Sequence, residues 1–135
     1  MLEIKDGDIV LARHIRPSDI KEGLNFFSED NEFVQVGFWA YNKGKKLLAH
    51  AHNIVARQAN ITQEVLFIKN GKVRARIYDC QKNLIQTFEA VSGDIVIMLQ
   101  GAHGYDILED GTEVLEVKNG PYPGAEADRT RIEHE

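Results

Sequence analysis

Apolar and polar residues alternate with a period of two along most of the chain, and this pattern predicts short β-strands. Turn residues, mainly glycine and asparagine, separate the alternating segments. Residues 18–27 differ, because Ser18 follows Pro17 as a possible N-cap and predicts a short helical segment near the N-terminus. The expected strands cover residues 8–14, 32–41, 46–53, 63–69, 72–78, 83–89, 93–99, 105–108 and 112–118. Many short strands at this spacing indicate an all-β fold, either a closed barrel or a sandwich.

The pair Asn70-Gly71 lies between two apolar strands and is typical of a two-residue hairpin turn. In such a hairpin Lys69 pairs with Lys72, and Glu64 shares a face with the apolar residues Leu66, Ile68, Val73, Ala75 and Ile77. This face predicts a protein interior with one carboxylate at its mouth. The opposite face carries Val65, Phe67, Arg74 and Arg76. We expect the N-terminal segment or a second subunit of a homodimer to cover its apolar part.

Composition restricts the class of protein. A chain of 135 residues with 43% hydrophobic content is expected to form one soluble domain. Its 16 basic and 21 acidic residues give a net charge of −5, which disfavours nucleic-acid binding. The single cysteine, Cys80, excludes an internal disulfide and fits a reducing compartment. No segment is apolar enough for a signal peptide or a membrane span, so we expect a cytoplasmic protein that does not bind membranes.

Three histidines and one carboxylate form a candidate metal site. His50 and His52 lie two positions apart on an expected strand, so their side chains project to the same face. Glu64 is expected on a neighbouring strand and His103 on one placed diagonally across a barrel. Three imidazoles and a carboxylate suit Fe, Mn, Ni, Co or Zn as divalent ions. The other two histidines, His14 and His134, are expected in solvent.

The same residues carry a resemblance to the cupins, a family of small barrels. Gly44, five residues, His50-x-His52, a gap, Glu64, six residues and Gly71 follow the first cupin motif, although the gap of eleven residues is longer than usual. Gly93, Gly101 and His103 fit the second motif loosely. The resemblance covers about residues 33–118, and parts of the chain also resemble small single-domain cupins associated with bacterial surface-polysaccharide genes.

The resemblance implies an all-β, cupin-type double-stranded β-helix, or jelly-roll barrel. We therefore expect a single cupin domain over residues 1–135, with a barrel core at about 33–118 and a C-terminal tail at 120–135. It also implies that His50, His52, Glu64 and His103 bind a divalent transition metal. The fold by itself does not identify a function.

Three functions remain open. The chain is expected to be a metalloenzyme that acts on a small oxygenated metabolite such as a sugar or keto acid, with Tyr105 as the one nearby candidate for catalytic proton transfer. The second hypothesis is a small-molecule binding or regulatory module that catalyses no reaction. The third is a metal-free isomerase or epimerase for nucleotide-linked sugars. All three imply a small-molecule ligand.

Overall fold

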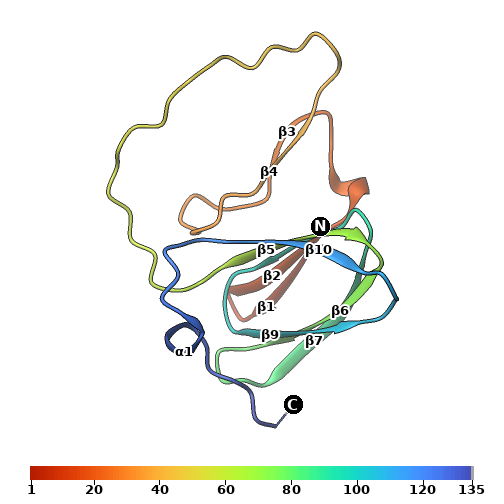
Figure 1. The fold of residues 1–135 in the computed structure, drawn as a ribbon, viewed down its shortest axis with the longest axis vertical. Helices are drawn as coiled ribbons and strands as arrows, with labels where there is room; N and C mark the ends of the chain where they lie inside the picture. Colours follow the sequence, from red (N-terminus) through yellow and green to blue (C-terminus); the bar gives the residue numbers. More distant parts are fainter. Residues whose placement is uncertain (135) are drawn as a thin grey trace.

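Two antiparallel sheets face each other in the computed structural model, which describes residues 1–134 (Figure 1). The larger sheet has the order β1 (Leu2–Asp6), β2 (Ile9–Ile15), β8 (Ile95–Met98), β5 (Glu64–Asn70) and β10 (Glu113–Lys118). The smaller sheet has the order β7 (Leu84–Val91), β6 (Lys72–Tyr78) and β9 (Ala102–Ile107). A separate hairpin joins β3 (Gly23–Phe26) to β4 (Gly37–Ala40). The all-β prediction is confirmed, although the sheets formed by residues 1–134 do not close into a barrel.

The main hydrophobic core lies between the two facing sheets. Alternate residues of most strands point into it, as the period-two pattern requires, whereas β2 contributes the adjacent residues Leu11 and Ala12 where its register with β1 shifts. The larger sheet contributes Ile4, Leu11, Ala12, Leu66, Ile68, Val96 and Met98, and the smaller sheet contributes Val73, Ala75, Ile77 and Ala90. All are at most 5% exposed, so this layer supplies the hydrophobic stabilisation of the fold.

The turn at Asn70-Gly71 does not join two paired strands, so the predicted pairing of Lys69 with Lys72 is wrong. The strand β5 pairs with β8 and β10, whereas β6 pairs with β7 and β9. The chain therefore crosses from one sheet to the other at Gly71. A Cβ atom at Gly71 would collide with Thr112, and its φ of 88° also favours glycine. The predicted interior face is nevertheless confirmed, because Leu66 and Ile68 of β5 and Val73, Ala75 and Ile77 of β6 point into the same core from opposite sheets.

A second apolar cluster covers the outer face of the larger sheet. Its buried members are Ile15, Val34, Ile95, Ile97 and Leu99, against which Val65, Phe27 and Phe38 pack. The segment 27–38 thus covers Val65, and the expected cover over this part of the patch comes from the N-terminal third of the chain. Phe67 remains 37% exposed.

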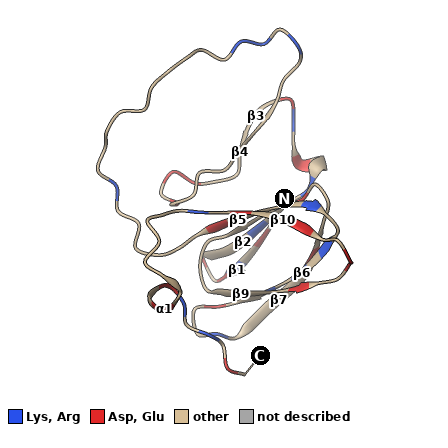
Figure 2. Cartoon of the chain, viewed as in Figure 1, with Lys and Arg blue, Asp and Glu red and all other residues tan. Residues whose placement is uncertain are grey.

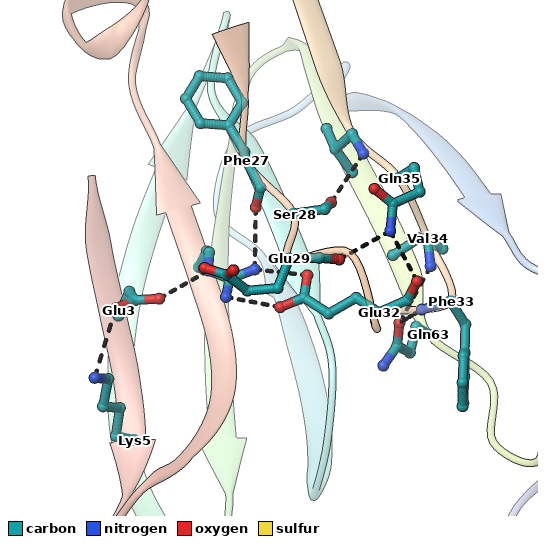
Figure 3. A network of polar contacts seen from close by, with 12 residues as sticks. Glu3, Lys5, Phe27, Ser28, Glu29, Glu32, Phe33, Val34, Gln35 and Gln63 are labelled. Atoms are coloured by element: carbon teal, nitrogen blue, oxygen red, sulfur yellow. Dashed lines mark hydrogen bonds and ion pairs between the residues drawn. The ribbon is translucent and has the colours of Figure 1, made fainter.

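The buried Arg13 attaches this covering segment to the sheet, and Figure 3 labels its partners Glu3, Phe27 and Glu32. The Arg13 guanidinium donates to Glu3 Oε2 at 2.8 Å, to Glu32 Oε2 at 2.7 Å and to the Phe27 carbonyl at 3.0 Å. Gln63 adds a second attachment, since its Oε1 accepts the backbone N–H groups of Phe33 and Val34 at 2.8 and 3.2 Å. Arg13 thus attaches the cover to β2, and Gln63 attaches it to the residue that directly precedes Glu64.

The expected N-terminal helical segment is reduced to one 3₁₀ turn, η1 (Pro17–Asp19), and part of its range forms β3. The expected strand at 32–41 is shortened to β4. The expected strand at 46–53 is not formed, and residues 41–63 run as a long connection away from the sheets (Figure 1). We call this segment the 41–63 loop.

After β10 the tail holds a short helix, α1 (Ala125–Asp128). None of the helices in residues 1–134 is long and apolar enough to cross a membrane.

Candidate functional site

Glu64, His103 and Tyr105 meet at one end of the space between the two sheets. Glu64 is only 6% exposed. Its Oε1 accepts the Tyr105 hydroxyl at 2.8 Å and lies 2.8 Å from His103 Nε2. The His103 side chain is 31% exposed, so it links the buried carboxylate to solvent. We call these three residues the Glu64 cluster.

Strand register explains why these residues meet. In β9, His103 and Tyr105 are opposite Ile77 and Ala75 of β6, so they share the inward face with buried core residues. Glu64 begins β5 in the facing sheet, opposite Met98. The turn before β9 contains Gly101, where φ is 73° and a Cβ atom would collide with the Tyr78 carbonyl. Glycine there lets β9 start close against β6.

The Glu64 cluster has a polarised electrostatic arrangement. Burial raises the pKa of Glu64, but the hydrogen bond and charge of His103, together with the Tyr105 hydroxyl, outweigh burial and lower this pKa from 4.5 to about 2. Burial and the negative charge of Glu64 raise the pKa of Tyr105 far above its ordinary value. Tyr105 therefore stays protonated and donates to a carboxylate that stays ionised at neutral pH.

A pocket of about 710 Å³ opens onto the Glu64 cluster. Its walls come from both sheets, and its rim comes from the end of the 41–63 loop and from the tail beyond β10. Lys118, opposite Glu64 in the β5–β10 register, holds its Nζ 3.8 Å from Glu64 Oε2. A volume of this size fits a small metabolite.

The rim is held together by contacts between the loop end and the tail. Asn119 accepts the Gln63 N–H at 2.7 Å and donates to the Ile61 carbonyl at 3.2 Å. The Thr62 hydroxyl donates to Asp128 at 2.5 Å. The pocket mouth is therefore framed by segments that are distant in sequence.

The four predicted metal ligands lie as two separate pairs. Glu64 and His103 touch at the pocket, whereas His50 and His52 lie on the exposed 41–63 loop with ring centroids 5.0 Å apart. Within residues 1–134, no three histidine, cysteine, aspartate or glutamate side chains come together as a metal-binding group. The strand that was expected to place His50 and His52 on one face is not formed, and the two rings meet edge to face on the loop, with an angle of 77° between their planes.

Sequence reasoning missed Lys118 and the tail as parts of the pocket. Lys118 ends an alternating strand, a position that does not distinguish an inward from an outward lysine.

Arg76 was expected on the outer face, and it pairs there with Asp106 at 2.5 Å while also lining the pocket edge. His14, expected in solvent, is 2% exposed and bonded to Asp94 at 2.8 Å.

Comparison with protein-family models, with curated proteins and with solved structures finds no match for this chain.

Proposed function

We propose that the chain is a small metal-binding cupin whose pocket takes a small oxygenated metabolite such as a sugar or keto acid. The contact between Glu64 and His103 carries this proposal. The two residues come from different cupin-like motifs and from different sheets, yet their donor atoms lie 2.8 Å apart on a pocket wall. An imidazole nitrogen and a carboxylate oxygen at one point are suitable ligands for a divalent transition metal.

The order of strand pairing supports a jelly-roll architecture. From β5 to β10, β5 pairs with both β8 and β10, while β6 pairs with both β7 and β9. The chain thus passes back and forth between two facing sheets, as in a jelly roll. Within residues 1–134, β9 and β10 each have one strand neighbour and one free edge. A further strand on each edge would bring the sheets closer to closure.

The 41–63 loop is the segment suited to supply these strands. Its apolar side chains are exposed, including Leu48 at 77% and Ile54 at 104%. Within the described chain, one backbone–backbone hydrogen bond, from Lys45 N–H to the Asn42 carbonyl, involves residues 43–60. When an extended segment joins a sheet edge, burial of its aliphatic side chains and pairing of its backbone groups both lower the free energy of the protein.

The loop contains four of the chain's 16 basic residues and none of its 21 acidic ones (Figure 2). Charge therefore favours its return to the acidic remainder of the protein.

In the proposed closed form, His50 and His52 join Glu64 and His103 as metal ligands. A metal bound there would polarise a chelated carbonyl oxygen or hold O₂ beside a chelated substrate. Tyr105 keeps the Glu64 carboxylate oriented through its hydroxyl, and the apolar pocket wall formed by Leu66, Val73 and Met98 excludes water from the reacting group.

Elemental analysis of protein purified without chelator or affinity-tag metal tests this proposal. We expect one transition-metal ion per chain, retained after gel filtration, and at least tenfold less metal in His52→Ala and His103→Ala. His134→Ala is the matched control, because His134 is an exposed histidine near the C-terminus. Full metal content in both site variants, or no metal in wild type after reconstitution, would overturn the assignment of these ligands.

A metal-free acid–base site is the second candidate, and the Tyr105–Glu64–His103 hydrogen bonds favour it specifically. In this function Glu64 orients the His103 imidazole, whose partly exposed ring exchanges a proton with a sugar carbon acid. Chelator-treated protein would then catalyse deuterium incorporation from D₂O into nucleotide-linked keto sugars, and His103→Gln would abolish it. Loss of exchange on metal removal would exclude this alternative.

We further propose that the chain forms a homodimer through the exposed outer side of β5 and β10. Phe67 and Leu115 are opposite each other in the register, and Val117 continues the same face. Leu115 and Val117 are 59% and 51% exposed. Such a continuous apolar strip on a two-strand face is typical of a subunit interface.

A further inference from the structure

Four basic side chains and three carboxylates line the pocket. Basic side chains reach its lining from β6, from β10 and from the tail, namely Arg76, Lys118, Arg129 and Arg131. The lining also contains three carboxylates, and each has a partner. Glu64 is bonded within its cluster, Glu116 lies 3.0 Å from Lys118 Nζ, and Asp128 accepts the Thr62 hydroxyl.

Among residues 1–134, Arg129 and Arg131 are the basic residues of this rim that have no counterion. Within residues 1–134, neither guanidinium makes a hydrogen bond or a salt bridge, and both side chains are exposed. Glu116 raises the pKa of Lys118, and the charge of Arg129 opposes this rise, so Arg129 lies near enough to Lys118 for the two cations to repel each other. Two guanidinium groups that have no ion-pair partner among residues 1–134 therefore lie at the mouth of the pocket.

We propose that the pocket rim binds the anionic group, a phosphate or a carboxylate, of the metabolite whose oxygenated part reaches the Glu64 cluster. Arg129 and Arg131 are the residues that bind this group. A guanidinium presents paired N–H donors that fit two oxygens of either anion, and an arginine without a competing carboxylate needs no exchange of partner. The inference rests on the proposed function only in taking this pocket as the ligand site.

The pocket size indicates a metabolite and not a free anion. The volume of about 710 Å³ far exceeds what one phosphate or carboxylate occupies. An anion at the rim leaves most of the pocket, including the wall around Glu64 and Tyr105, for an uncharged remainder. The expected ligand is therefore a small phosphorylated or carboxylated compound with hydroxyl or carbonyl groups.

Isothermal titration calorimetry on chelator-treated protein tests the inference with three probes: inorganic pyrophosphate, malonate and the neutral methyl α-glucoside. We expect at least one of the two anions to bind with one site per chain, and the glucoside to bind at least tenfold more weakly. The Arg129→Gln/Arg131→Gln double variant is expected to weaken anion binding at least tenfold. A stronger response to pyrophosphate identifies a phosphate ligand, and a stronger response to malonate identifies a carboxylate ligand.

The control is Lys21→Gln/Arg74→Gln, which removes two exposed cations that do not line this pocket and should leave anion binding unchanged. Circular dichroism melting checks that both double variants remain folded. Failure of both anions to bind wild type, or equal binding to the Arg129→Gln/Arg131→Gln variant, would overturn the inference. Metal content distinguishes the two proposals, because the arginine variant is expected to retain its metal whichever way the titration comes out.

Discussion

At the scale of single residues, Glu64 depends on a complete set of donors. Its carboxylate is nearly inaccessible to water, and the contacts from His103 and Tyr105, with the charge of Lys118 at 3.8 Å, take the place of the water it has lost. A buried carboxylate is stable only with such partners, and loss of a hydrogen bond to a charged group is costly.

Tyr105→Phe removes one of these donors without changing the shape of the ring. We expect the free energy of unfolding to fall by about 1.5–3 kcal/mol, the usual range for a hydrogen bond to a charged group. Urea denaturation followed by circular dichroism measures the change. Tyr122→Phe, at a tyrosine that is 58% exposed, is the control and should change stability little. Equal stability of wild type and Tyr105→Phe would show that the bond to Glu64 contributes nothing.

The Arg13 attachment predicts acid sensitivity. The hydrogen bond from Arg13 holds the pKa of Glu3 below its ordinary value of 4.5, against the opposing effect of burial. Because the folded-state pKa is depressed, this stabilisation is fully present above pH 4.5 and is lost as the pH falls through the folded-state value. Glu3→Gln should therefore be less stable than wild type at pH 7, and the difference should shrink below pH 4.5.

Urea denaturation at pH 7, 5, 4 and 3 checks this expectation, with Glu126→Gln as a control at an exposed carboxylate of α1. A stability difference between wild type and Glu3→Gln that stays constant down to pH 3 would contradict the assigned role of Glu3.

Some single-residue environments could not be predicted from sequence. His14 lies two residues from Ala12 on the inward face of β2, stacks on Phe88 and bonds to Asp94, which is far away in the chain. A local pattern shows that a strand has an inner face, but it does not show which distant carboxylate meets that face. Glu64 was predictable as an inward residue because five apolar neighbours marked its face.

At the scale of elements, sequence periodicity located most strands and failed where pairing is non-local. The range of β6 was predicted to the residue. The predicted ends of β5, β7, β8 and β10 lie within about two residues of the observed ends. The pairing of β5 with β6 was wrong because Asn70-Gly71 signals a reversal of direction but not the sheet that receives the next strand. Residues 46–53 alternate like a strand, yet they pair with no sheet edge in this structure, because local alternation does not specify which distant edge receives a strand.

The proposed closure of the 41–63 loop predicts protection from protease. Lys43, Lys45, Lys46 and Arg57 are tryptic sites on this exposed segment. Metal should slow trypsin cleavage there at least tenfold, because docked strands must open before they are cut. Mass spectrometry of timed digests measures cleavage at each site, with Lys82, in the turn before β7, as the internal reference.

His50→Ala should abolish this protection while leaving the cleavage rate without metal unchanged. Equal cleavage of wild type with and without metal would show that the loop does not close over the pocket.

At the scale of the whole molecule, the exposed outer strip of β5 and β10 predicts self-association. Phe67→Asp should convert a dimer to a monomer, because a charge in the centre of an apolar interface is desolvated without a partner. Light scattering coupled to gel filtration measures the mass. Val65 is unsuitable for this test because it packs into the second core cluster, so its replacement would also unfold the cover.

Ile85→Asp is the matched control, at an apolar side chain of β7 that is 41% exposed on the other sheet. A monomeric wild type, or a dimer that persists in Phe67→Asp, would exclude this interface.

The fastening of Gln63 to the backbone of Phe33 and Val34 has a consequence for how such a protein diversifies. The returning end of the 41–63 loop is held by the cover segment and by Asn119, independently of what lies between residues 41 and 60. Lengthening a loop between fixed ends costs little, since the entropy of closure grows only with the logarithm of its length. Insertions, deletions and new side chains can therefore accumulate in this segment while the sandwich stays intact. Natural selection can in this way exchange the side chains of this loop without rebuilding the sandwich that holds its two ends.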